Sequence, residues 1–228
     1  MSLKEKSYNF TGKVAIVTGS SSGIGSAIAL QLASNGALVV ITGRSESKLE
    51  TISKKIETIS NRKPLQMVGD LLNRSFAPKL VEETIEKYGR IDYLVNNAGA
   101  PSHNESTIKG SIVNISSAAS MKPWMLLYST AKAALDMLTK TSAGCLASKG
   151  IRVNSINPGP VYTSNGRFFA TEDYYHSNRE QLEAMTALKR IGNPDDVANV
   201  ALFLLSDQAI NMTGSIVACD GGVLVCME

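Results

Sequence analysis

The chain has 228 residues, the length of one domain large enough to bury most of its apolar surface. Apolar residues make up 43% and charged residues 19% of it, a globular balance that excludes disordered, collagen-like and coiled-coil chains. The net charge is +3 without a long run of one sign, so the composition gives no indication of a nucleic-acid or membrane partner.

Cysteine and histidine content predicts neither a disulfide framework nor a metal site. Cys145, Cys219 and Cys226 are odd in number and form no C-x-x-C pair, and His103 and His176 are far apart in the sequence. The first ten residues lack the apolar core of a signal peptide, and no apolar run approaches the ~20 residues of a membrane span. We therefore expect a cytoplasmic protein.

Short apolar runs alternate with helix-periodic stretches along the chain. The predicted strands are 14–18, 38–41, 65–68, 91–96, 111–115, 152–157 and 215–218. The predicted helices are 24–34, 46–58, 77–88, 128–148 and 195–205. This alternation is typical of repeated βαβ units, so we expect an α/β fold in which a doubly wound parallel sheet lies between two helical layers. No linker or repeat occurs, so 1–228 should form a single domain.

Residues 97–110 interrupt the alternation. They are polar, contain Pro101, and have Ile108 as their sole large apolar residue, so no amphipathic helix fits there. A crossover between parallel strands normally needs a dozen or more residues, usually a helix. The sequence thus predicts that the crossover helix around 100–110 is missing and that one sheet face is uncovered. The cause is either a true deletion or the omission of residues between these strands.

A glycine-rich loop joins the first predicted strand to the first predicted helix. At this position a parallel sheet offers backbone N–H groups and a positive helix end to a phosphate. Gly19 permits the tight turn, Gly23 the approach of a pyrophosphate, and Gly25 the packing of helix on strand. The residues expected to bind a dinucleotide here are Thr18, Gly19, Ser21, Ser22, Gly23, Ile24 and Gly25.

Four motifs in order resemble the short-chain dehydrogenase/reductase family. They are the Gly-x-x-x-Gly-x-Gly loop, Asn96-Asn97-Ala98-Gly99, Tyr128-Ser129-Thr130-Ala131-Lys132 and Pro158-Gly159. The match covers nearly the whole chain except the region around 100–110. The resemblance implies a Rossmann-type fold, a nicotinamide cofactor, a small-molecule carbonyl or alcohol substrate, and a homodimer or homotetramer.

The end of the second strand indicates the cofactor. It carries no carboxylate that would accept the ribose 2′-OH, and Arg44 has the planar fork that suits a phosphate, so NADP(H) is favoured over NAD(H). Arg44 as a solvated loop cation is the alternative. By resemblance, Asp70 and Leu71 flank the adenine, although Asp70 is alternatively a cap or turn residue. The resemblance adds as cofactor contacts Asn97, Ala98, Gly99, Pro158, Gly159, Val161 and Thr163.

Tyr128 and Lys132 are four residues apart on a predicted helix and so share one face. A nearby ammonium favours the phenolate of a tyrosine, whose ordinary pKa is about 10, and this suits a general acid or base. By resemblance, Ser117 rather than Ser116 holds the substrate oxygen, and Lys132 also contacts the nicotinamide ribose. The predicted catalytic residues are therefore Ser117, Tyr128 and Lys132, and hydride transfer should interconvert a carbonyl and a secondary alcohol.

Two features leave alternatives open. Trp124, Met125 and the aromatic residues of 164–186 favour an apolar substrate, but they equally suit lid packing. The family's further polar residue, an asparagine, belongs to the crossover helix that this sequence lacks, and nothing aligns Asn104 with it. An alternative function is therefore a catalytically degenerate dinucleotide-binding protein.

Overall fold

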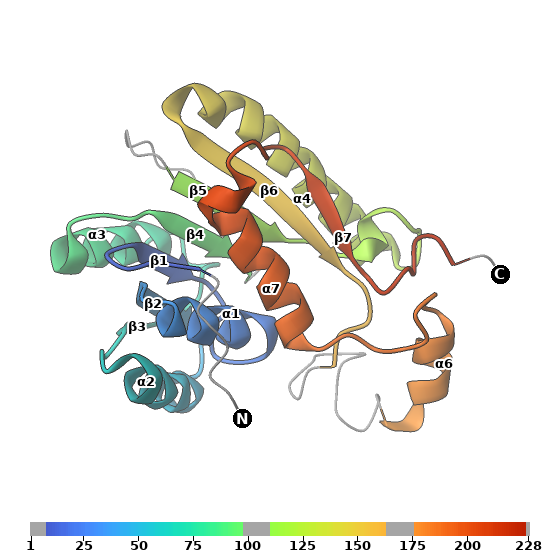
Figure 1. Ribbon diagram of the computed structural model, residues 1–228, viewed down its shortest axis with the longest axis horizontal. Coiled ribbons are helices and arrows are strands. Elements are labelled where there is room, and N and C mark those ends of the chain that lie inside the picture. Colours follow the sequence, from blue (N-terminus) through green and yellow to red (C-terminus); the bar gives the residue numbers. More distant parts are fainter. Residues whose placement is uncertain (1–7, 98–109, 163–175, 227–228) are drawn as a thin grey trace.

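The computed structural model describes residues 8–97, 110–162 and 176–226 (Figure 1). Their strands form one parallel sheet in the order β3-β2-β1-β4-β5-β6-β7. The chain moves outward from β1 to β3 and then returns to add β4 on the other side of β1, which is the doubly wound order expected from the sequence. The strands are β1 (Val14–Val17), β2 (Leu38–Gly43), β3 (Leu65–Val68), β4 (Tyr93–Asn96), β5 (Gly110–Ile115), β6 (Ile151–Pro158) and β7 (Ile216–Cys219).

Helices cover both faces of this sheet. The covering helices are α1 (Gly23–Ser34), α2 (Glu46–Ser60), α3 (Phe76–Tyr88), α4 (Leu126–Leu146) and α7 (Pro194–Leu205). A short further helix, α6 (Arg179–Ala184), has no buried residue and lies away from the sheet in Figure 1. Helices α1, α2 and α7 pack on one face, and α1 and α7 lie side by side in front of the strands in Figure 1. Helices α3 and α4 pack on the opposite face. The three-layer Rossmann-type arrangement predicted from the sequence is confirmed.

The alternating side chains of the strands explain why the sheet needs both layers. In β1, Ala15 and Val17 belong to the core under α1, α2 and α7, whereas Val14 and Ile16 belong to the core under α3. All four side chains are almost fully buried. A strand buried on both faces reads as a continuous apolar run, and that pattern is what the sequence shows at 14–18.

The predicted elements form, with ends that shift by up to two residues. Helix α4 begins at Leu126 rather than Tyr128. The prediction missed this start because Leu126 and Leu127 are exposed and add nothing to the apolar periodicity of the helix. The helix ends at Leu146 because the chain then tightens into a 3₁₀ turn and reverses at Gly150, whose φ is +73°. The short helix α6 was not predicted, since its six residues carry no apolar face. No helix in the described ranges is long and apolar enough to cross a bilayer.

An open groove lies between α3 and α4, above β4 and β5. These two strands are parallel neighbours, as expected, but residues 98–109, which join them, lie outside the described residues. Among the residues that are described, no helix lies between α3 and α4, and a cavity of about 760 Å³ occupies that place. Its apolar lining includes Leu80, Val81, Leu94, Ile112, Leu138 and Leu146. That the crossover helix is missing therefore remains a prediction, and the groove is the place on the sheet that such a helix would cover.

Candidate active site

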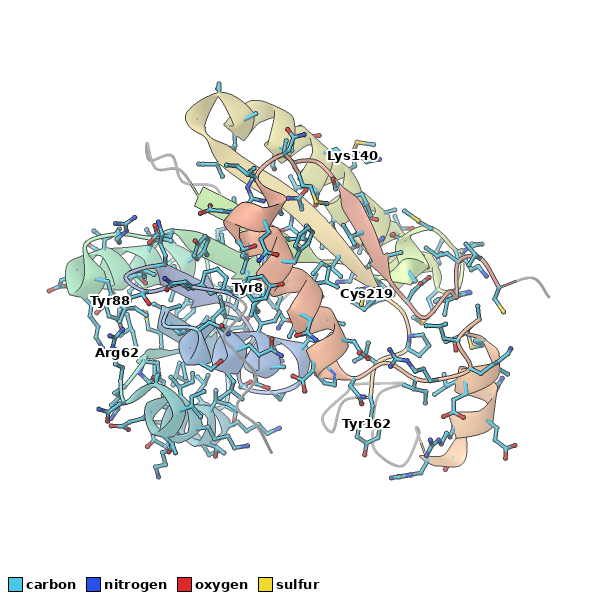
Figure 2. The ribbon with its side chains drawn as sticks, in the orientation of Figure 1. Tyr8, Arg62, Tyr88, Lys140, Tyr162 and Cys219 are labelled. Atoms are coloured by element: carbon cyan, nitrogen blue, oxygen red, sulfur yellow. The ribbon has the colours of Figure 1, made fainter. Side chains whose placement is uncertain are left out.

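The sequence motifs gather at one edge of the sheet. The glycine loop follows β1, Asn97 follows β4, Ser117 follows β5 and Gly159 follows β6, and the carboxyl ends of parallel strands lie at the same edge. Figure 2 labels Tyr162 and Cys219, which lie near the ends of β6 and β7 at this edge. In doubly wound sheets, ligands bind at this edge, beside the point where the strand order reverses.

The glycine loop has a backbone that side chains would disturb. Gly19 and Gly23 have φ values of +63° and +58°, in the left-handed region that favours glycine. A Cβ atom on Gly25 would lie 2.6 Å from the carbonyl oxygen of Gly19 and 2.5 Å from Nδ2 of Asn97. The loop therefore stays close to the start of α1 only because residue 25 has no side chain.

Asn97 and Thr18 fasten this loop to β4. The Asn97 amide donates to the carbonyl oxygens of Thr18 at 3.0 Å and Gly19 at 3.1 Å. The Thr18 hydroxyl donates to the carbonyl oxygen of Val95, and it accepts from the backbone N–H of Asn97. Asn97 thus supports the loop from behind, a role that the sequence analysis did not assign, and its expected place beside the ribose stays a prediction.

Ser20 fastens the same loop to β2, although the sequence analysis did not name it. Its hydroxyl oxygen accepts from the backbone N–H of Thr42 at 3.0 Å, and its own N–H donates to the Thr42 carbonyl. Ser22 is the N-cap of α1, yet its side chain makes no capping hydrogen bond, and the first turn of α1 contains no acidic residue. The N-terminus of α1 is therefore suited to an external anion.

Arg44 and Asp70 lie together beyond the ends of β2 and β3. The Arg44 guanidinium Nη1 is 4.0 Å from Asp70 Oδ2, and both side chains are well exposed. Asp70 also accepts from the backbone N–H of Leu72 through Oδ1, so its role as a turn residue is observed. Because an exposed ion pair is worth little, Arg44 can exchange this partner for a phosphate at small cost. Leu71 is half-buried and packs against the core under α3.

Ser117 rather than Ser116 faces the edge. The Ser116 side chain is buried, and its hydroxyl donates to the carbonyl oxygen of Lys132 in α4. Ser117 begins the 3₁₀ turn Ala118–Ser120, and its partly exposed hydroxyl oxygen accepts from the backbone N–H of Ala119 at 3.1 Å. That hydroxyl keeps its own proton for a hydrogen bond to a ligand, which agrees with the choice made from the sequence.

Tyr128 and Lys132 share one face of α4, as their spacing predicts. The Lys132 ammonium lies 5.6 Å from the centre of the Tyr128 ring and donates to the carbonyl oxygen of Ile115 at 2.9 Å. Tyr128 is 43% exposed at the start of the helix. Burial lowers the pKa of the Lys132 ammonium below the usual range, and the Asp136 carboxylate opposes that shift. The pair places a partly buried cation beside an exposed tyrosine.

The loop after β6 approaches β7 very closely. A Cβ atom on Gly159 would lie 2.6 Å from the carbonyl oxygen of Asp220, so only glycine fits beside this backbone. Val161 is buried and pairs as an isolated parallel bridge with Gly192. The Asp220 carboxylate accepts from the backbone N–H groups of Gly222 and Leu224 and shapes the adjoining turn. Thr163, Ala98 and Gly99, also predicted contacts, lie outside the described residues.

The remaining sequence candidates are the histidines and the apolar residues before Tyr128. The part of the chain that the structure describes contains no group of three or more His, Cys, Asp or Glu residues able to hold a metal ion. His176 is exposed and contacts the Tyr162 ring edge-on at 6.3 Å between centroids. Trp124 and Met125, which the sequence analysis placed near the substrate, are about 40% exposed in the segment before Tyr128.

Comparisons with known proteins agree with this geometry. The model of a family described as "short chain dehydrogenase" matches residues 13–108, and the model described as "Enoyl-(Acyl carrier protein) reductase" matches residues 101–224. The chain is 37% identical to an L-xylulose reductase of Caenorhabditis elegans, over 94% of this chain and 97% of that protein. It is 33% identical to a 3-oxoacyl-[acyl-carrier-protein] reductase of Thermotoga maritima, over 94% and 98%.

Solved structures give the same result in three dimensions. The L-sorbose reductase of Gluconobacter frateurii, complexed with NADPH and L-sorbose, superposes with a TM-score of 0.83 at 28% identity, covering 96% of this chain and 99% of that one.

The alignment with the nematode reductase has 252 positions but contains only 94% of these 228 residues. That relative therefore carries a few dozen residues that have no counterpart here.

Proposed function

The chain belongs to the short-chain dehydrogenase/reductase family and is an oxidoreductase acting on CH–OH and C=O groups, and we propose that it uses NADP(H) with Tyr128 as its general acid and base. The observation that carries the proposal is the pairing of an exposed Tyr128 side chain with a partly buried Lys132 ammonium, 5.6 Å from the ring centre. This pairing lies at the sheet edge that also holds the glycine loop.

The residues at this edge fit a dinucleotide. Gly25 lets the loop carbonyls and the start of α1 approach each other, and α1 presents N–H groups that no side chain caps. Such a helix end binds the pyrophosphate of a dinucleotide, and the backbone of the glycine loop would surround that pyrophosphate. Arg44, which forms an exposed ion pair with Asp70, would take the 2′-phosphate that distinguishes NADP(H) from NAD(H).

The side chains at the site divide the proton chemistry among them. When bound, the nicotinamide supplies or accepts a hydride. In reduction, Ser117 donates a hydrogen bond to the carbonyl oxygen, and the Tyr128 hydroxyl delivers the proton to that oxygen. The Lys132 ammonium stabilises the negative charge that then develops on the Tyr128 oxygen. Oxidation is the reverse, with Tyr128 accepting the proton of the alcohol.

Exposed apolar side chains supply the proposed substrate and assembly surfaces. Trp124 and Met125 shortly precede Tyr128 and are partly exposed, so a substrate with an apolar part would find contacts near the hydroxyl. Met185, which follows α6, is a further exposed apolar residue. Helix α4 also presents Leu126 and Leu127, each more than 80% exposed. Apolar side chains this exposed are typical of an interface, which supports the proposed homodimer or homotetramer.

The proposal is tested by oxidation of NADPH and of NADH, followed at the nicotinamide absorbance, against a panel of carbonyl compounds. The panel contains L-xylulose and L-sorbose, the substrates in the names of relatives, beside apolar aldehydes and ketones. We expect turnover with a clear preference for NADPH. Tight NADPH binding without turnover on any member would instead support the degenerate dinucleotide-binding protein.

Arg44→Asp tests the cofactor preference separately. The variant places a carboxylate beside Asp70, which would repel a 2′-phosphate and accept a ribose hydroxyl. We expect the ratio of kcat/KM for NADPH to that for NADH to fall at least tenfold. Equal ratios in the wild type and the variant would show that Arg44 does not contact the phosphate.

A further inference from the structure

We propose that Asp136, which has no place in the mechanism above, is the buried counter-charge of Lys132 and thereby positions the Tyr128–Lys132 pair for proton transfer. The inference rests on the proposed function, because it assigns Asp136 a task in the reaction of Tyr128. It concerns a residue of the network under α4 and not one that touches substrate or cofactor.

Asp136 continues the row of side chains that begins with Tyr128. The three residues follow one another at intervals of four along α4, so they lie on one face of the helix. Asp136 is only 8% exposed, and this face packs against the sheet. An acidic residue four positions after a lysine is the weaker order for stabilising an isolated helix, so helix propensity does not account for it.

Neutral donors fix the carboxylate in place. Its Oδ1 accepts from the Ser155 hydroxyl at 3.2 Å, and its Oδ2 accepts from the Asn157 amide at 2.9 Å. Both donors belong to β6 and are fully buried. A buried carboxylate that is bonded only to neutral groups is costly unless an opposite charge lies nearby. Lys132, one turn earlier on the same face, is the cation in that position.

Within the part of the chain that the structure describes, the side chains that hydrogen-bond around Lys132 and Asp136 carry no charge that would neutralise either of them, so each is the counter-charge of the other. Among the described residues, the side chains that hydrogen-bond to α4 from β5, β6 and the residue after β5 are neutral, namely Asn114, Ser116, Ser155 and Asn157. Ser120 of the 3₁₀ turn, which bonds to Asn157, is neutral as well. Tyr128 is the other titratable side chain in the row. Burial disfavours the charged form of Lys132, and Asp136 is the charged group that favours it.

The same network reaches the serine of the site. Asn157 donates to Asp136 and also to the Ser120 hydroxyl at 2.8 Å. Ser120 ends the 3₁₀ turn in which the Ala119 N–H donates to the Ser117 hydroxyl oxygen. Hydrogen bonds through Asn157 therefore connect Asp136, one helical turn after Lys132, to the 3₁₀ turn that follows Ser117.

Asp136→Asn removes the charge and can keep both hydrogen bonds. The asparagine oxygen can still accept from Asn157, and the Ser155 hydroxyl can turn to accept from the new amide. Ser155→Ala is the matched control, because it removes one of these bonds and leaves the charge. Asp136→Ser is measured in parallel as a second neutral variant, so that a folding failure of one leaves the other.

The readout is the titration of the Lys132 side chain, observed by NMR of protein labelled with ¹³C at the lysine Cε and assigned with Lys132→Arg. We expect the midpoint to fall by about 1–3 pH units in the neutral variants, the shift that loss of a close opposite charge produces. Ser155→Ala should shift it by less than half as much. The pH profile of kcat should move with the titration, while KM for NADPH stays within about threefold.

Two results would overturn the proposal. One is a Lys132 titration in folded Asp136→Asn or Asp136→Ser that matches the wild type, and the other is an equal shift in Ser155→Ala, which would leave Asp136 a purely structural role. The titration of Lys132 needs no turnover. An inactive wild type would therefore refute the proposed function, while the titration would still show whether Asp136 acts as the counter-charge of Lys132.

Discussion

Gly25→Ala is the substitution whose effect the structure defines most closely. The new methyl would enter between the Gly19 carbonyl oxygen and Asn97 Nδ2, at 2.6 Å and 2.5 Å from them. Those two atoms form a hydrogen bond of 3.1 Å, so the methyl must break that bond and push the loop away from α1. Overpacking of this kind costs about 1–3 kcal/mol. Because the displaced loop must return to its wild-type position to bind the pyrophosphate, binding of NADPH is weakened by this free energy. The Kd for NADPH should therefore rise about 5- to 150-fold.

The assay is titration calorimetry of NADPH binding on wild type and variant, with circular dichroism and thermal unfolding as checks on the fold. Gly144→Ala is the matched control, since a Cβ atom at this position of α4 meets no atom within 4 Å. That variant should bind NADPH like the wild type and gain about 0.5–1 kcal/mol of stability, because glycine is unfavourable inside a helix. A folded Gly25→Ala protein with an unchanged Kd would refute the assignment of this loop.

Two further substitutions test other parts of the account. Ser117→Ala should lower kcat about 10²- to 10³-fold while NADPH binding persists, since it removes the hydroxyl assigned to the substrate oxygen; normal turnover in this variant would exclude Ser117. Burial raises the pKa of Tyr93 to about 12, so the unfolded chain loses this proton near pH 10 while the folded chain retains it. Stability should therefore fall between about pH 10 and 12, by at most about 2.7 kcal/mol from this group. Tyr93→Phe keeps the ring that packs edge-on against Phe10, and its stability should decline less over that range in urea unfolding; parallel curves would contradict the shift.

Periodicity predicted the layers of the fold because the central strands of this sheet, β1 and β2, are buried on both faces. The run Val14–Val17 is apolar throughout, and the helices after it repeat apolar residues at helical spacing. The ends of elements depend on tertiary contacts that periodicity does not contain. Leu126 and Leu127 extend α4 although both are exposed, and no sequence pattern distinguishes them from loop residues.

Motif spacing predicted the residues at the sheet edge, but it missed those that hold them in place. Ser20, which ties the glycine loop to β2, lies between motif positions and has no pattern of its own. Ser155 and Asn157 belong to β6, far from α4 in the sequence, and only the fold brings them to Asp136. Asp136 itself had a signal, because it follows Lys132 at the same interval of four residues that links Lys132 to Tyr128.

The identity of the reacting group is tested most directly by Tyr128→Phe, measured with NADPH and the best carbonyl compound from the panel. The substitution removes one oxygen from a partly exposed side chain, so the fold and the Lys132 contact with the Ile115 carbonyl should persist. We predict that kcat falls about 10²- to 10⁴-fold, which is the contribution of a positioned proton donor, while the Kd for NADPH stays within about threefold of the wild-type value. Turnover equal to that of the wild type would contradict the assignment of Tyr128 as the general acid and base.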